Sequence, residues 1–274
     1  MGLFASTPKY LRSLSMFNKP GPACPYCGNV IITKDGNYFV CSFCEMHSEE
    51  KQAKSLRGDI RALLTSKNNL ILSNSWDEAA KLTEQIITLE STPQRLYSTA
   101  IFYEMFSNYC WHNIKYDLGG YMEQNSVNRE KSWALLARSK SFFYESIKTC
   151  AEEIKTGQEV DLAFIKLLAE SRVSKLADAK ETLGIITKSL VADQVKDYAC
   201  MVYYTSIKDP KSAMRCVSNV STAEVSAFYY VAKLLANEKR TKDAKEILQL
   251  LIQKTAMPRA AELLFKINDL QNNV

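Results

Sequence analysis

The sequence predicts a mainly α-helical chain that carries one small β-hairpin near its N-terminal end. Three observations lead to this fold class. Four of the eight cysteines form two Cys-x2-Cys pairs, thirteen residues apart, around a segment rich in β-branched and aromatic residues. Glycine and proline become sparse after Ser48, and apolar residues there recur at helical spacing. The pattern Asp178–Leu183 returns 65 residues later as Asp243–Leu248.

Composition and length narrow the class of protein further. The chain has 274 residues, 46% hydrophobic and 24% charged, with 9 glycines and 7 prolines. This profile excludes a disordered or fibrous protein, and the length suggests about two domains. No apolar run approaches the ~18 to 20 residues that span a bilayer. Because Lys9 and Arg12 interrupt any secretory signal, we expect a cytoplasmic protein in a reducing compartment.

The two cysteine pairs have the spacing of metal ligands. A Cys-x2-Cys pair turns the backbone tightly enough for both sulfurs to reach one ion, and two pairs complete a closed tetrahedral zinc site. We therefore expect one structural Zn2+ and no catalytic water. A redox dithiol and a disulfide pair are weaker alternatives, because no βαβ unit accompanies the pairs. His47 lies beyond the second pair and is not counted as a ligand. The predicted zinc ligands are Cys24, Cys27, Cys41 and Cys44.

The segment between the two pairs predicts the hairpin. Residues 30–33 and 37–40 have strand composition, and Asp35-Gly36 is a turn signal between them. Gly28 follows the first pair, where a positive φ is convenient. Residues 23–47 as a whole resemble the zinc-ribbon family, in which two cysteine knuckles at the ends of a β-hairpin clamp zinc. The resemblance implies a docking surface for protein or nucleic acid, although the thirteen-residue gap is slightly shorter than the commonest ribbon spacing.

The remaining cysteines have no such spacing. We interpret them as buried thiols of a reducing compartment. They are Cys110, Cys150, Cys200 and Cys216.

The rest of the chain predicts about nine or ten helices. We expect a connecting helix over residues 48–73 and a helical domain over 74–274. Thr92-Pro93 and Asp209-Pro210 each place a cap residue before a proline suited to the first helical position, and Pro258 suits the start of the last helix.

Further start and stop signals divide this helical region. Ser75 with Glu78 and Ser221 with Glu224 have capping-box spacing. Gly119-Gly120 and Gly157 indicate breaks between helices.

Alanines mark the internal repeat. Ala179 and Ala244 occupy the same place in the two copies of the recurring pattern, and Ala213 lies between them, 34 residues after the first and 31 before the second. Ala80 lies 99 residues before Ala179, which is three periods of 33. These intervals predict an array of helix pairs, since helical repeats of this length each contain two helices.

Residues 228–258 are the clearest single repeat and are similar to a tetratricopeptide repeat. Lys239 stands where that family favours glycine, and Pro258 falls two residues late. The resemblance implies an α-solenoid over 74–274 with a groove that binds a peptide or a helix; a closed helical bundle is the alternative fold. The matching positions are Phe228, Val231, Ala232 and Leu235 in the first helix, and Ala244, Leu248 and Leu251 in the second.

Residues 1–22 are predicted to form a flexible basic arm. Lys9, Arg12 and Lys19 precede the first acidic residue, Asp35, and such an arm is suited to contact phosphates of RNA or a ribosome. Gly2 fits the myristoylation pattern, so a membrane partner is expected only if Gly2 is acylated.

The sequence favours a function without catalysis. It contains no glycine-rich phosphate loop, nucleophile elbow or His-Glu-x-x-His motif, and only two histidines. No small-molecule substrate is implied. The net charge of +5, or +3 once four thiolates hold one zinc ion, is too small to require nucleic acid. We expect an adaptor that docks a protein partner; a ribosome- or RNA-associated factor is the alternative, and a transcription regulator is less favoured.

Overall fold

The computed structural model describes most of the chain after residue 22. The predicted arm with Gly2, Lys9, Arg12 and Lys19, the glycines at 119–120 and 157, and the capping box at 221–224 lie outside the described residues. The residues that the structure describes are 23–29, 32–35, 38–41, 44, 46–49, 56–116, 122–154, 160–191, 193–217, 225–255 and 258–272.

A three-stranded antiparallel sheet follows the first cysteine pair. Its strands are β1 (Ile32–Asp35), β2 (Tyr38–Cys41) and β3 (His47–Glu49), in that order. Asp35 pairs with Tyr38, so residues 36 and 37 join the first two strands, one position later than the predicted Asp35-Gly36 turn. The third strand was not predicted; it occupies the start of the segment expected to be the connecting helix, which begins instead at Gly58.

The rest of the described chain is helical, as predicted. Its first two helices form a short hairpin, and the next two are much longer, 24 and 33 residues. The helices are α3 (Gly58–Leu72), α4 (Trp76–Leu89), α5 (Pro93–Tyr116), α6 (Met122–Ile154), α7 (Val160–Arg172), α8 (Leu176–Lys188), α9 (Asp193–Ser206), α10 (Pro210–Val217), α11 (Val225–Asn237), α12 (Thr241–Thr255) and α13 (Pro258–Asn272).

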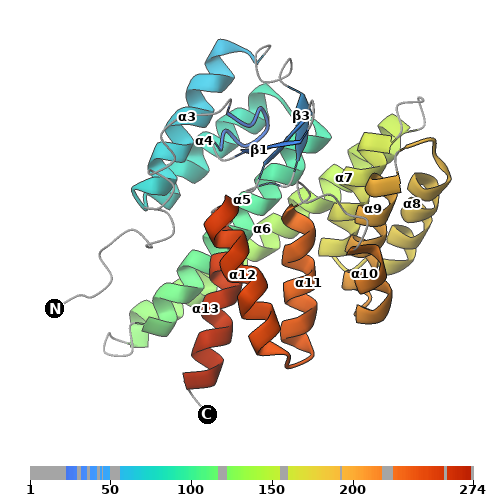
Figure 1. The fold of residues 1–274 in the computed structure, drawn as a ribbon. Helices are drawn as coiled ribbons and strands as arrows, with labels where there is room; N and C mark the ends of the chain where they lie inside the picture. Colours follow the sequence, from blue (N-terminus) through green and yellow to red (C-terminus); the bar gives the residue numbers. More distant parts are fainter. Residues whose placement is uncertain are drawn as a thin grey trace.

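The helices form an array of antiparallel hairpins (Figure 1). Each of α3, α5, α7, α9 and α11 packs on the helix that follows it. Along the C-terminal half, α7 also contacts α9, α9 contacts α11, and α11 contacts α13. First helices of successive hairpins therefore lie against one another, which is how helical hairpins stack in a repeat array.

One turn geometry recurs in four of these hairpins. It joins α3 to α4, α7 to α8, α9 to α10 and α11 to α12, and its middle residue has a φ of 60° to 62° in each case. The N–H of the next residue donates to the carbonyl five residues earlier, from Ser75 to Leu70 over 2.8 Å and from Arg240 to Leu235 over 2.9 Å. This is the Schellman arrangement that ends helices. The four middle residues are Asn74, Ser174, Lys208 and Lys239.

A buried alanine follows each of these turns, five residues after the positive-φ position. The four alanines have no exposed surface, and they are Ala79, Ala179, Ala213 and Ala244. Three of them are the alanines on which the sequence repeat was aligned. In the first hairpin the sequence alignment chose Ala80, but the structure buries Ala79 instead, so that register was wrong by one residue. Ala80 is only partly buried, because it lies one residue further around the helix.

Three helices start directly after their predicted cap residues, and two of these residues make the expected cap hydrogen bond. Thr92 accepts a hydrogen bond from the Arg95 N–H at the start of α5, and Asp209 accepts one from the Ser212 N–H at the start of α10. Ser75 stands at the predicted N-cap of α4, but its side chain accepts a bond from the Ser73 hydroxyl and makes no cap hydrogen bond. The prediction was therefore right about where α4 begins and wrong about the hydrogen bond of the capping box.

One hydrophobic core joins the cysteine segment to the helices. The four clustered cysteines and Met46 belong to the same set of packed buried side chains as residues from α3 to α13. Trp76 of α4 stacks on Phe102, Phe106 and Tyr109 of α5. The cysteine segment is thus packed into the helical scaffold. Among the described residues no helix is long and apolar enough to cross a membrane.

Candidate metal centre

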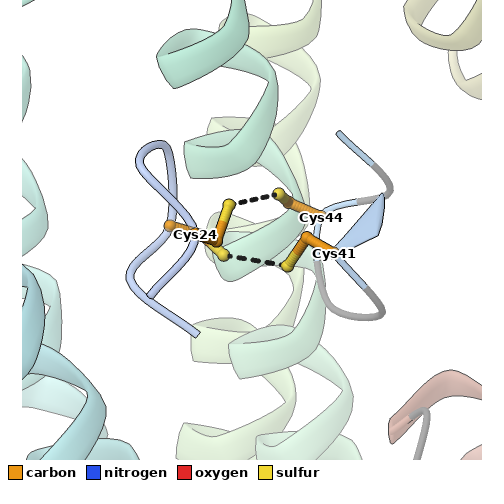
Figure 2. Close-up of side chains that lie close together, drawn as sticks. Cys24, Cys41 and Cys44 are labelled. Carbon is orange, nitrogen blue, oxygen red and sulfur yellow. Dashed lines mark hydrogen bonds between the residues drawn. The ribbon is translucent and has the colours of Figure 1, made fainter. Parts of the chain in front are cut away.

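The structure brings the four predicted ligand cysteines together. Their sulfurs all lie within 4.8 Å of one another, and each residue is at most 1% exposed. The Sγ atoms of Cys24 and Cys44 are 3.7 Å apart, and those of Cys27 and Cys41 are 3.4 Å apart (Figure 2). Four sulfurs around one ion at Zn–S distances near ~2.3 Å would be about 3.8 Å apart. A disulfide requires about 2.05 Å. The arrangement therefore fits a metal tetrathiolate and not two disulfides.

Backbone turns place the sulfurs. The Cys24 carbonyl accepts the Gly28 N–H over 2.8 Å, and the Cys24 N–H donates to the Asn29 carbonyl over the same distance. Across the site, the Cys41 N–H donates to the Met46 carbonyl over 3.0 Å. The first cysteine pair lies before the sheet, and the second begins with the last residue of β2, so strand pairing brings the two pairs into register.

Gly28 has the positive φ that its place after the first pair suggested, +80°. A Cβ atom here would lie 2.7 Å from the Leu64 Cβ of α3. The Asn68 side-chain amide, one turn further along α3, donates to the Gly28 carbonyl. Glycine is required for both the backbone conformation and the close approach, and the first cysteine turn therefore rests directly on α3.

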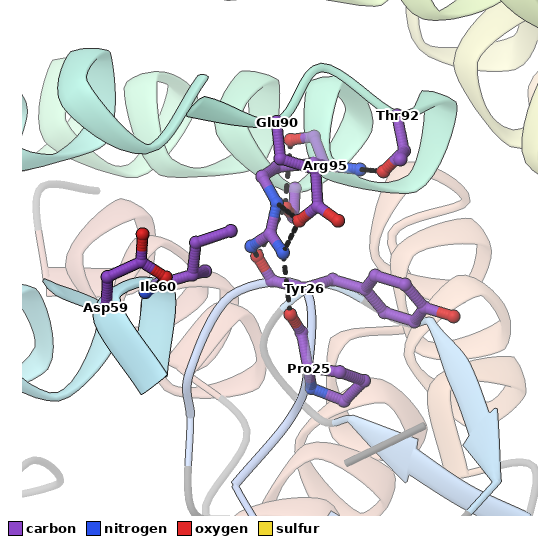
Figure 3. Close-up of polar contacts among 8 residues, drawn as sticks. Pro25, Tyr26, Asp59, Ile60, Glu90, Thr92 and Arg95 are labelled. Carbon is purple, nitrogen blue, oxygen red and sulfur yellow. Dashed lines mark hydrogen bonds and ion pairs between the residues drawn. The ribbon is translucent and has the colours of Figure 1, made fainter. Parts of the chain in front are cut away.

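Arg95 of α5 holds the other side of the same turn (Figure 3). Its guanidinium donates to the Tyr26 carbonyl over 2.9 Å and to the Pro25 carbonyl over 3.1 Å. The Arg95 Nε donates to the Glu90 carboxylate over 2.8 Å, which orients the guanidinium. The Ser98 hydroxyl adds a bond to the Tyr26 carbonyl over 3.2 Å. These contacts satisfy the two carbonyls between Cys24 and Cys27 that no strand reaches, and sequence reasoning missed all of them.

Electrostatics at the site favours a bound cation. Burial raises the pKa of the Cys41 and Cys44 thiols, and hydrogen bonding to Cys24 adds to that rise. Burial opposes ionisation of Cys24 as well, but thiol hydrogen bonds from Cys27, Cys41 and Cys44 outweigh it and lower the pKa of Cys24. Burial thus disfavours the thiolate forms of Cys41 and Cys44. Full ionisation needs a positive ion among them.

The donor set points to a structural ion. Four cysteine sulfurs with no exposed surface are the ligands of closed zinc sites, in which no coordination position remains for water or substrate. If a metal binds, Cys24, Cys27, Cys41 and Cys44 would hold it, and it would cross-link the segments before and after the hairpin.

Two of the four scattered cysteines differ from the expectation of buried thiols. Cys110 and Cys150 are buried, and burial raises their pKa to about 11 and about 12. Cys200 of α9 and Cys216 of α10 are partly exposed; burial raises the pKa of both thiols, to about 11 at Cys216, and each also affects the pKa of the other. Their separation of 16 residues gave no sign of this influence, which depends on how the two helices pack.

Comparison with known proteins adds no relative to these observations. No family model, no curated protein and no solved structure matches the chain.

Proposed function

We propose that this protein is a non-catalytic adaptor in which one structural zinc ion fixes the N-terminal segment to a helical-hairpin array that docks a protein partner. The repeated turn carries the proposal: the same positive-φ geometry and the same buried alanine occur in four hairpins. Arrays of stacked helix pairs present extended surfaces for peptides or helices of other proteins.

Zinc is proposed as the ion because of the ligands. Thiolates select soft or borderline ions, and zinc is the common choice for four buried cysteines. The hairpin between two cysteine pairs supports the likeness to zinc ribbons, although here a third strand extends the sheet and α3 and α5 contact the first cysteine turn. The free thiols elsewhere in the described chain are in keeping with a reducing, cytoplasmic location.

The likeness to tetratricopeptide repeats is strongest in α11 and α12. Lys239, in the family's glycine position, has a φ of 62°, a conformation that glycine adopts without strain. The small residues Ala232 and Ala244 are fully buried, as close helix packing in such repeats requires. These features favour an open array over a closed bundle, and the longer α5–α6 hairpin is then an irregular unit within it.

An exposed face of α6 is the surface we propose for docking. Trp133 and Tyr144, 58% and 47% exposed, lie three turns apart on one side of the helix, with the exposed cations Arg129 and Lys140 beside them. Glu130 is the acidic residue at the edge of this face. Aromatic side chains and arginine are enriched in protein interfaces relative to the rest of the surface. The flanking cations favour an acidic amphipathic segment as the occupant.

Affinity purification from the native host tests the proposal. The tagged full-length protein is compared with a Trp133→Ala/Tyr144→Ala double variant and with Trp111→Ala as a control, since Trp111 is an exposed tryptophan on α5. We expect a nuclease-resistant protein, bound through an acidic segment, that the double variant loses and the control keeps.

The alternative function gives a different result. A ribosome- or RNA-associated factor would retain ribosomal particles or RNA that are released by nuclease and by rising salt. That outcome would contradict the adaptor proposal and direct attention to the basic arm, with Lys9, Arg12 and Lys19.

A further inference from the structure

One arginine joins helices that belong to three different hairpins of the array. Arg172 is the last residue of α7, and its side chain is 11% exposed. Its guanidinium donates to both carboxylate oxygens of Glu104 on α5, each over 3.4 Å, and to the hydroxyl of Tyr230 on α11 over 3.3 Å. Tyr230 is 7% exposed. Counted from α3–α4, Arg172 of the third hairpin therefore contacts both the second hairpin and the fifth.

The link from α7 to α11 passes over a hairpin. Repeats of a stacked array as a rule contact only their immediate neighbours. Here α11 packs mainly on α9, α10, α12 and α13, and α9 in turn packs on α7. The α9–α10 hairpin thus stands between α7 and α11 along the array. The long side chain of Arg172 connects the two ends directly.

The repeated turn shows that this link is particular to one hairpin. Arg172 lies two residues before Ser174, the positive-φ residue of the α7–α8 turn. The same place in the other three turns is occupied by Leu72, Ser206 and Asn237, none of which carries a charge. Among these four turns, a charged link through this position is available only to α7–α8.

The link is made by side-chain tips, and its contacts are long. Strong hydrogen bonds between a guanidinium and a carboxylate measure about 2.7 to 2.9 Å, whereas those from Arg172 to Glu104 measure 3.4 Å. Neighbouring helices of the array are instead joined by buried apolar side chains. A small movement therefore breaks the Arg172 contacts before it disturbs the packing of adjacent helices. The α9–α10 hairpin is the natural hinge, since α10 has only eight residues.

We propose that Arg172 is a latch that holds the helical array in a closed curvature, and that the array opens about the α9–α10 hairpin when this latch is released. With the latch made, α11 to α13 are tied to α5 and α7. Without it, α11 to α13 stay attached through α9 and α10 and move away from α5. This inference goes beyond the proposed adaptor function, and either can fail while the other stands.

The test compares the full-length wild type with two latch variants and one control. Arg172→Met removes the guanidinium, and Tyr230→Phe removes a hydroxyl while keeping the ring. Arg240→Met is the matched control, because Arg240 pairs with Asp243 over 2.6 Å within a single hairpin. Small-angle X-ray scattering measures the radius of gyration, and amide hydrogen exchange measures the protection of each helix.

We expect the radius of gyration of Arg172→Met to exceed that of wild type by about 5 to 10%, because an opened array is less compact. Amides of α11 to α13 should exchange about tenfold faster, while those of α5 and α6 keep their protection. Tyr230→Phe should shift both quantities less in the same direction, since Glu104 still binds Arg172. Arg240→Met should match wild type.

Two results would overturn the latch. One is identical scattering and exchange in wild type and Arg172→Met. The other is faster exchange spread evenly over all helices of Arg172→Met, which would show that Arg172 stabilises the whole fold and does not tie two ends of it together.

A third variant covers a folding failure of Arg172→Met. Arg172→Lys keeps the charge but lacks the forked guanidinium that reaches two partners at once. If Arg172→Met does not fold, faster exchange confined to α11 to α13 in Arg172→Lys and Tyr230→Phe supports the latch. Exchange at the wild-type rate in both of these variants overturns it.

Discussion

The guanidinium of Arg95, in the first turn of α5, donates a 2.9 Å hydrogen bond to the backbone carbonyl of Tyr26, between the first two cysteines. The two residues are 69 positions apart in the chain. This contact makes the geometry of the cysteine turn dependent on a helix of the array. It follows that the metal centre and the helices should be lost together when the contact is broken.

Arg95→Met is the first prediction. It leaves the Pro25 and Tyr26 carbonyls and the Glu90 carboxylate without their donor, so we expect about 3 kcal/mol less stability in urea and faster zinc loss. Arg57→Met is the control, because Arg57 pairs with Asp59 on an exposed surface. The role assigned to Arg95 is wrong if the two variants unfold at the same urea concentration.

The second prediction concerns the ligands themselves. Cys24→Ser should reduce bound zinc well below one ion per chain, since a hydroxyl is a poor replacement for a buried thiolate. Cys110→Ser, a buried cysteine outside the cluster, should keep one zinc. Because the cluster shares its core with the helices, we also expect Cys24→Ser to lower the thermal midpoint of the helical signal in circular dichroism. An unchanged midpoint would show that the cysteine segment folds independently of the array.

The third prediction uses the repeated turn. Lys239 is exposed and has a φ of 62°, so Lys239→Gly removes left-handed strain and should stabilise the protein by about 0.5 to 1 kcal/mol. Glu238→Gly, in the same turn, relieves no such strain and should destabilise it through chain entropy. Denaturant unfolding measures both. If Lys239→Gly is no more stable than Glu238→Gly, the turn geometry is not as described.

The fourth prediction tests the alanine register. Ala79→Leu should overpack the α3–α4 contact and cost about 1 to 3 kcal/mol, and Ala244→Leu should do the same between α11 and α12. Ala80→Leu, at the position the sequence alignment chose, should cost much less, because Ala80 is only partly buried. Thermal or urea unfolding of the three variants would contradict the register if Ala80→Leu were the most damaging.

The fifth prediction is a pH dependence. Glu170 is fully buried, and burial raises its pKa, although the ion pair with the Lys166 ammonium, 2.6 Å away, opposes the rise. Folding therefore favours the protonated form, and this contribution to stability is present below the unfolded pKa and lost as pH rises through the folded one. The stability of wild type minus that of Glu170→Gln should fall as the pH rises above the usual glutamate pKa of about 4.3. The exposed Glu181→Gln is the matched control; an equal slope for both would contradict the assignment.

Local chemistry explains which features could be predicted from the sequence. The four ligands follow from the spacing of two cysteine pairs, and Pro93, Pro210 and Pro258 do begin helices because proline fits the first helical position. The alanine repeat revealed the hairpin array, since each hairpin needs a small residue where two helices approach. The hairpin turn was predicted one residue too early, and the buried alanine of the first hairpin one residue too late, at Ala80 instead of Ala79. In both places neighbouring residues offered the same local signal.

Other features depend on contacts that no local pattern encodes. The third strand, His47–Glu49, forms because β2 offers a free edge after the second cysteine pair. The electrostatic influence of Cys200 and Cys216 on each other arises from the packing of α9 on α10. In each case the two interacting parts belong to different helices or strands, and the local sequence of one does not show which other segment it will pack against.

The sequence by itself determined the metal ligands, the helical class and the repeat, because each depends on residues close together in the chain and on their spacing. Only the tertiary structure decided that the cysteine turn rests on α3 and α5 and that Arg95 donates hydrogen bonds to its carbonyls. The physical reason is that burial and charge compensation are properties of a packed neighbourhood. An arginine in a helical sequence is ordinarily solvated, and only packing places Arg95 against the cysteine turn.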